Sequence, residues 1–128
     1  MAQEPQRKVV LVVDDDESVR SLVVKALRVK GYEVVEAEDG LKACELLGNL
    51  KRIPDLMICD VMMPTFDGFS LVRMIKGRAE LKGMPIIFLT AKTQPKDLLQ
   101  GMSLGARHYV LKPFNLQDLL DKVAKTVS

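Results

Sequence analysis

The sequence predicts a doubly wound α/β fold, in which a five-stranded parallel sheet lies between two layers of helices. Short apolar runs alternate with amphipathic helical segments five times along the 128 residues, a pattern typical of βαβ units. The apolar runs are almost free of polar residues, as expected for strands that are covered on both faces. Several runs stop directly at an acidic, hydroxyl or lysine side chain, at the sheet edge where ligands bind in open α/β folds.

The first two units follow this pattern closely. Residues 8–13 form a Val-rich strand, and residues 17–30 carry apolar side chains at helical spacing. Gly31 closes this helix, because glycine easily takes the left-handed conformation found at helix C-termini. A second strand is expected over residues 32–37, and a second helix over residues 41–50.

The remaining three units are separated by segments rich in proline and glycine, which interrupt helices and strands. Their strands are short apolar runs, and their helices repeat apolar residues at helical spacing. The expected strands are residues 55–60, 85–90 and 108–111, and the expected helices are residues 69–76, 95–104 and 116–127.

Periodicity does not give the spatial order of the strands. We adopt the order 2-1-3-4-5, the common arrangement for five doubly wound units joined by right-handed crossovers. In this order the first and third strands are neighbours. The residues that follow these two strands are therefore expected to lie side by side.

Length and composition indicate one domain over residues 8–128, preceded by a flexible polar tail at residues 1–7. The net charge is only +2, and the basic residues are scattered among a similar number of acidic ones, which argues against direct binding to nucleic acid. No apolar stretch approaches the ~20 residues that cross a bilayer, and no signal peptide is present. We expect a cytoplasmic protein without a membrane partner.

Polar side chains that suit a hard cation and a phosphoryl group follow the predicted strands. Three aspartates, Asp14, Asp15 and Asp16, follow the first strand, and Asp60 follows the third. Clustered carboxylates repel one another unless they share a proton or a cation. Oxygen ligands without nearby His or Cys favour Mg²⁺. Because a carboxylate can attack phosphorus, Asp60, which stands alone at its strand end, is the candidate nucleophile.

Each of these residues also has an ordinary structural interpretation. The aspartates after the first strand could cap the following helix, and Asp60 could belong to a turn. Thr90 suits a strand as a β-branched residue, and Lys112 with Pro113 could form a plain turn. The convergence of all four motifs on one sheet edge favours the functional interpretation.

Four segments together resemble the motif set of the response-regulator receiver domain, in its single-domain, CheY-like form. The resemblance extends from Lys8 to about Val127, and it implies a flavodoxin-like (βα)5 fold. The segments are, in order, VVLVVDDDES, LMICDVMMPTFDG, IIFLTAK and GARHYVLKPF.

The resemblance implies that Asp60 accepts a phosphoryl group from the phosphohistidine of a histidine kinase or a histidine phosphotransfer protein. Asp15 would bind Mg²⁺ directly and Asp14 mostly through water, while Asp60 and the backbone carbonyl of Met62 complete the protein ligands. Lys112 would pair with a phosphoryl oxygen, and the peptide bond between it and Pro113 is expected to be cis.

The family's switch pair corresponds to Thr90 and Tyr109. Phosphorylation would move the Thr90 hydroxyl and turn the aromatic ring inward, which changes the face formed by the fourth helix, fifth strand and fifth helix for an unknown downstream partner. Met62 and Lys92 occupy the positions that tune the lifetime of the phosphoryl group, and neither assists an attacking water. We therefore expect no classical enzyme, but a chain that catalyses its own phosphorylation and slow dephosphorylation.

Two other functions remain possible at this stage. A haloacid-dehalogenase-like phosphatase would use Asp14 as nucleophile and Asp16 as acid/base, but the later acidic residues Asp118 and Asp121 fall on a helix instead of a strand end. A non-phosphorylated binding module on the same fold is the second alternative. Whether the chain acts alone or belongs to a larger regulator is left open.

Overall fold

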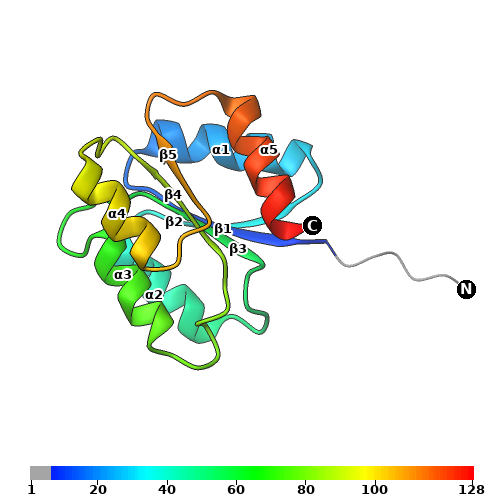
Figure 1. Cartoon of the computed structure of the whole chain (residues 1–128). Helices are drawn as coiled ribbons and strands as arrows, with labels where there is room; N and C mark the ends of the chain where they lie inside the picture. The colour runs from blue at the N-terminus through cyan, green and yellow to red at the C-terminus, as the bar shows by residue number, and fades with distance from the viewer. Residues whose placement is uncertain (1–6) are drawn as a thin grey trace, which may run out of the picture.

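The computed structural model describes residues 7–128 and contains five parallel strands and five helices (Figure 1). The predicted tail lies outside the described residues except for Arg7. The strands are β1 (Val9–Val13), β2 (Glu33–Ala37), β3 (Leu56–Cys59), β4 (Ile86–Thr90) and β5 (His108–Leu111). The helices are α1 (Glu17–Val29), α2 (Gly40–Asn49), α3 (Gly68–Lys76), α4 (Pro95–Ser103) and α5 (Leu116–Val127). Every predicted element is present, and each end lies within one residue of its expected position.

The strands are ordered β2-β1-β3-β4-β5, which confirms the predicted order. Strand β1 lies between β2 and β3 and pairs with both. At its carboxyl end, Val13 pairs with Ala37 on one side and with Cys59 on the other. The residues that follow β1 and β3 are Asp14 and Asp60, so the topology brings these two aspartates together.

Helices cover both faces of the sheet, as Figure 1 shows: α1 and α5 lie on one side, and α2, α3 and α4 on the other. Because successive strand residues point to opposite faces, each strand contributes to two cores. Under α1 and α5 the strand residues are Val10, Val12, Val34, Leu56, Ile58, Ile87, Leu89 and Val110. On the other face they are Leu11, Val13, Ala37, Met57, Cys59, Ile86 and Phe88.

Aspartates at three helix N-termini satisfy backbone amides that have no partner within the helix. Asp16 accepts hydrogen bonds from the amides of Ser18 and Val19, and Asp39 and Asp67 cap α2 and α3 in the same way. These caps set where the loops at the carboxyl edge of the sheet turn into helices. The peptide bond between Lys112 and Pro113 is cis, as expected.

Across residues 7–128, none of the helices has both the length and the apolar character required to cross a membrane.

Candidate functional site

Asp14 follows β1 directly and is almost completely buried, with 2% of its surface exposed. Its backbone amide donates to the carbonyl of Ala37, which extends the pairing of β1 with β2. Its carboxylate oxygen Oδ1 accepts a hydrogen bond from the amide of Asp16 at 2.9 Å. Burial disfavours the charged form and raises the pKa of Asp14, although a hydrogen bond from Lys112 opposes this shift.

Asp60 follows β3 and is 5% exposed. Its backbone amide donates to the carbonyl of Val13 at 2.9 Å, so the backbone around it continues the sheet. Its Oδ1 atom accepts a hydrogen bond from the amide of Met62 at 3.0 Å. Gly68 lies so close to the Asp60 carbonyl that only glycine fits at this position, because a Cβ atom would lie 2.3 Å from the carbonyl oxygen.

Lys112, after β5, joins the two aspartates. Its Nζ atom lies 2.9 Å from Oδ2 of Asp14 and 3.0 Å from Oδ2 of Asp60. Burial works against the charged lysine, but the hydrogen bonds to the two carboxylates outweigh it and raise the pKa of Lys112. One ammonium group therefore bridges two buried carboxylates that come from neighbouring strands.

Asp15 completes an acidic cluster. One carboxylate oxygen from each of Asp14, Asp15 and Asp60 lies within 4.8 Å of the others, and Asp15 is exposed while its two neighbours are buried. Carboxylate oxygens without His or Cys are the ligands that suit Mg²⁺. The donor set thus fits the predicted ion. The open side at Asp15 leaves room for waters, which Mg²⁺ usually retains.

Thr90 and Tyr109 are linked through the main chain of one loop residue. Thr90 is fully buried, and its Oγ1 atom accepts a hydrogen bond from the amide of Lys92 at 3.3 Å. The Tyr109 hydroxyl donates to the carbonyl of the same Lys92 at 3.0 Å. The Tyr109 ring packs beside Phe88, with 6.1 Å between ring centroids. The pair expected from the sequence is therefore connected across the β4–α4 loop.

The two predicted lifetime-tuning residues lie beside this loop. Met62 is 52% exposed, and the Lys92 ammonium lies 3.8 Å from a carboxylate oxygen of Asp97 in α4. Both residues line an open hollow of about 400 Å³, together with Ala91, Thr93, Gln94, Lys96 and Asp97.

A second, apolar hollow of about 490 Å³ adjoins Lys112 and shares Ala91 with the first. It lies where the start of α1 meets the segment between β5 and α5. Its other lining residues are Val19, Leu22, Ala91, Pro113, Phe114 and Leu116.

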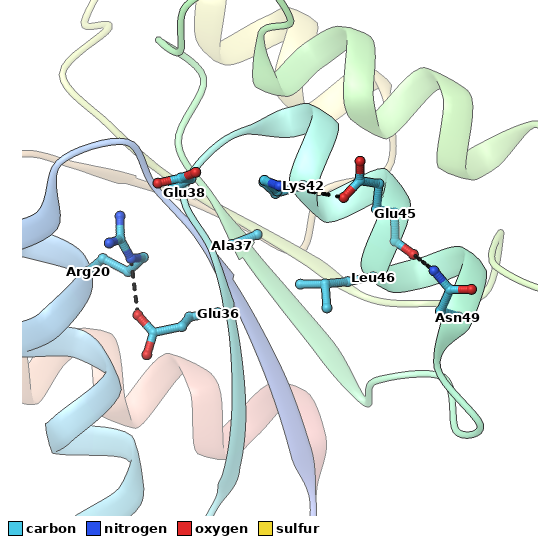
Figure 2. A pocket seen from close by; sticks show the side chains of 8 residues that line it. All are labelled: Arg20, Glu36, Ala37, Glu38, Lys42, Glu45, Leu46 and Asn49. Carbon is cyan, nitrogen blue, oxygen red and sulfur yellow. Dashed lines mark hydrogen bonds and ion pairs between the residues drawn. The ribbon is translucent and has the colours of Figure 1, made fainter.

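The sequence did not single out Arg20, which contacts the site from α1. Its Nη1 atom donates to the backbone carbonyl of Asp14 at 2.7 Å. Its Nε atom donates to Glu36 on β2 at 3.1 Å, as Figure 2 shows. An arginine on an amphipathic helix is too common to be noticed without the structure.

The residues of the phosphatase alternative are not arranged for that chemistry. Oδ1 of Asp16 is occupied as the cap of α1. Asp118 and Asp121 lie on α5, where they bond to Lys122 and Gln117 respectively. These contacts argue against acid/base or metal-binding roles for the three residues.

Comparison with known families agrees with the fold and the site. The family model described as the response regulator receiver domain matches residues 10–124. The chain belongs to this family. It is a response-regulator receiver domain of two-component systems, and its curated relatives are response regulators, not classical enzymes. Receiver domains as a family bind Mg²⁺ and interact with histidine kinases and downstream effectors.

Two curated relatives illustrate the similarity. This receiver domain is 38% identical over 114 residues to response regulator MprA from Mycobacterium sp. (strain KMS), a match that covers 89% of this chain and 48% of MprA. It is 36% identical over 114 residues to the DNA-binding dual master transcriptional regulator RpaA from Synechocystis sp., covering 89% of this chain and 46% of RpaA. The receiver domain thus spans about half the length of these relatives.

Solved structures of similar size match over almost their whole length. Chemotaxis protein CheY4 of Vibrio cholerae has a TM-score of 0.86 and 35% identity, with 94% of this receiver domain and 99% of CheY4 covered. A response regulator receiver protein from Pseudomonas putida has a TM-score of 0.88 and 33% identity, with coverages of 95% and 99%.

Proposed function

We propose that this receiver domain accepts a phosphoryl group on Asp60, with Mg²⁺, from the phosphohistidine of a histidine kinase or a histidine phosphotransfer protein. The observation that carries the proposal is the bridge of Lys112 between Asp14 and Asp60, with Asp15 within 4.8 Å of both carboxylates. This arrangement supplies a nucleophile, a cation-binding acidic cluster and a fixed positive charge at one sheet edge.

In the proposed reaction, a carboxylate oxygen of Asp60 attacks phosphorus. The bond between phosphorus and the imidazole nitrogen of the donor breaks, and the imidazole leaves with the bonding electron pair. Lys112 then pairs with a phosphoryl oxygen. Mg²⁺, when bound, neutralises charge on the phosphoryl oxygens. Asp15 would hold the ion directly and Asp14 mostly through water, with Asp60 and the Met62 carbonyl as the remaining protein ligands.

The proposed signal leaves the site through Lys92. The Thr90 hydroxyl can donate to a phosphoryl oxygen while it still accepts from the Lys92 amide. A movement of Thr90 toward the phosphoryl group would therefore be passed to Lys92, whose carbonyl accepts from the Tyr109 hydroxyl. The Tyr109 ring already packs beside Phe88, so phosphorylation would favour an arrangement that the chain can adopt without the phosphoryl group. A partner that binds the α4–β5–α5 face in this arrangement must, by linkage, also favour phosphorylation.

The apolar hollow beside Lys112 supports docking of a phosphodonor close to Asp60, since apolar area beside the reacting group provides a binding surface. Capture with the phosphorylated and unphosphorylated forms would identify the downstream target.

The decisive experiment is incubation with acetyl phosphate and Mg²⁺, followed by intact mass measurement. We expect the chain to gain one phosphoryl group, and Asp60→Asn to gain none. Asp67→Asn is the matched control, because asparagine caps helices as well as aspartate and should leave labelling intact. Absence of labelling in the wild type would favour a non-phosphorylated module. Labelling that survives Asp60→Asn but not Asp14→Asn would favour the phosphatase.

The phosphoryl group is expected to persist for minutes. The thioether of Met62 cannot orient an attacking water, and the ammonium of Lys92 cannot accept its proton. In a phosphate-release assay, Met62→Asn should shorten the lifetime, because an amide can hold a water near phosphorus. Met102→Asn is the control, since Met102 is exposed on α4 to a similar degree. Turnover of the wild type within seconds would contradict this prediction.

A further inference from the structure

Arg20 connects α1, β1 and β2 beside the acidic cluster. Its side chain is only 15% exposed, and Figure 2 shows it extended from α1 toward Glu36 on β2. Two bonds hold the guanidinium group: Nε donates to Oε1 of Glu36 at 3.1 Å, and Nη1 donates to the backbone carbonyl of Asp14 at 2.7 Å.

The Asp14 carbonyl needs this donor because the sheet ends beside it. The Asp14 amide still pairs with the carbonyl of Ala37, the last residue of β2. Among the backbone hydrogen bonds of residues 7–128, none reaches the Asp14 carbonyl. A nearly buried carbonyl without a partner is costly. Arg20 therefore supplies the hydrogen bond that the next pairing with β2 would otherwise have supplied.

This bond also restricts Asp15. The peptide group is planar, so a donor that fixes the Asp14 carbonyl also fixes the amide nitrogen of Asp15. Within the described part of the chain, the Asp15 side chain makes no hydrogen bond or ion pair of its own. Its position is thus set by the backbone, and the backbone is held by Arg20.

Glu36 gives the contact its direction. The donors of arginine form a rigid planar fork, so a bond at Nε determines where Nη1 points. The carboxylate of Glu36 also balances the positive charge of the guanidinium group, which would otherwise repel a cation bound nearby.

We propose that Arg20, oriented by Glu36, is a positioning residue that holds Asp14 and Asp15 in place for Mg²⁺. The inference rests on the proposed function, because it assumes that the acidic cluster binds this ion. Arg20 touches neither the ion nor the phosphoryl group, and it acts through the peptide between the two aspartates.

Titration of the purified chain with Mg²⁺ by calorimetry tests the inference directly. Arg20→Met should raise the Mg²⁺ dissociation constant about ten-fold or more, the range typical when a residue supporting a metal ligand is removed. Arg20→Lys should not restore the affinity, because one ammonium group cannot reproduce both bonds. Arg28→Met is the matched control: Arg28 also lies on α1 and donates to a β2 carbonyl, that of Val34 at 3.5 Å, but away from the site. It should bind Mg²⁺ like the wild type.

Labelling with acetyl phosphate at increasing Mg²⁺ separates positioning from a general loss of structure. For Arg20→Met, the half-saturating Mg²⁺ concentration should rise while the rate at saturating Mg²⁺ stays near that of the wild type. If Arg20→Met does not fold, Glu36→Ala leaves the arginine present but unoriented, and it should raise the dissociation constant in the same direction.

Wild-type Mg²⁺ affinity in Arg20→Met, or in Glu36→Ala where that variant is needed, would overturn the inference and leave the proposed function intact. A wild-type chain that neither binds Mg²⁺ nor becomes labelled would instead overturn the proposed function, and the inference with it.

Discussion

One ammonium group and three carboxylates define the charge of the site. When Asp14, Asp15 and Asp60 are ionised, Lys112 balances only one of them, and two negative charges remain uncompensated. Like charges held this close are unfavourable, more so because two of the three groups are buried. A divalent cation removes this repulsion, which gives the cluster a physical reason to bind Mg²⁺.

Mg²⁺ should therefore stabilise the folded chain. A ligand that binds only the folded state adds about 2.7 kcal/mol at a concentration one hundred times its dissociation constant. We expect Mg²⁺ to raise the midpoint of thermal unfolding of the wild type. The Asp15→Asn variant should lose most of this increase. Asp121→Asn, which changes an exposed aspartate on α5, should respond to Mg²⁺ like the wild type. Equal shifts in all three proteins would show that the ion does not bind at the cluster.

His108 is the single histidine of the chain, and basic side chains surround its imidazole. Burial lowers its pKa below 6.5, and the nearby charges of Lys122, Lys125 and Arg107 lower it further, while Asp118 acts in the opposite direction. The folded chain therefore binds fewer protons than the unfolded chain at pH values just below 6.5. The free energy of unfolding should decrease as the pH falls through this region.

The slope should be a fraction of the roughly 1.4 kcal/mol per pH unit that one full proton would give. His108→Gln should remove this contribution, which urea unfolding at several pH values can measure. Proton NMR of the single imidazole gives its pKa without ambiguity. A value at or above 6.5 would contradict the predicted direction.

At the scale of elements, the alternation of apolar and helical segments was sufficient to locate every strand and helix. Gly31, with a φ of 95°, ends α1 as its residue type indicated. The meeting of Asp14, Asp60 and Lys112 could also be predicted, because the carboxyl ends of parallel strands share one edge. The strands and helices follow from local periodicity. The meeting of the site residues depends also on the strand order, which periodicity does not give and which was adopted from the common arrangement for five doubly wound units.

Contacts made by loops could not be predicted in the same way. The two hydrogen bonds of Lys92 depend on how the β4–α4 loop turns, and one of them comes from Tyr109 on β5, seventeen residues away in the sequence. Arg20 likewise becomes important only because β2 stops one residue too early to pair with the Asp14 carbonyl. Contacts of this kind join residues that are far apart in the sequence, and they leave no periodic pattern from which they could be predicted.

The start of α3 packs directly against the backbone of Asp60, which predicts a strong effect for a small substitution. A Cβ atom at Gly68 would lie 2.3 Å from the Asp60 carbonyl oxygen and 2.9 Å from Cα of Val61. Gly68→Ala should therefore displace α3 or Asp60, and it should lower both the unfolding midpoint and the rate of phosphorylation.

Gly48→Ala is the matched control for this substitution. Gly48 lies within α2, and a Cβ atom there would have no neighbour within 4 Å. Alanine should stabilise the helix by about 0.5–1 kcal/mol relative to glycine. If both variants behave alike in thermal unfolding and labelling, close packing of α3 on Asp60 is not required for the site.

At the scale of the whole molecule, the acidic cluster lies between two flanks of the sheet. On one flank, Arg20 and Glu36 tie it to α1 and β2; on the other, Thr90 leads through the β4–α4 loop to Tyr109. The second flank carries large exposed apolar side chains. These are Leu98, Leu99 and Met102 on α4 and Leu111 on β5. The first flank is expected to stay rigid while the second responds to phosphorylation.

Hydrogen exchange with and without the phosphoryl analogue beryllofluoride should reveal this asymmetry. We expect changes in exchange in the β4–α4 loop, α4 and β5, and none in β2 or α2. Thr90→Val keeps the shape of the buried side chain but removes its hydroxyl, so the analogue should still bind at Asp60 while the distant changes disappear. Thr90→Ser retains the hydroxyl and should preserve them.

A complete switch of the α4–β5–α5 face, from 1:99 to 99:1 in its two arrangements, requires about 5.5 kcal/mol of differential binding. Partial changes in exchange therefore still count as coupling. Changes of equal size in Thr90→Val and the wild type would mean that the signal leaves the site without this hydroxyl.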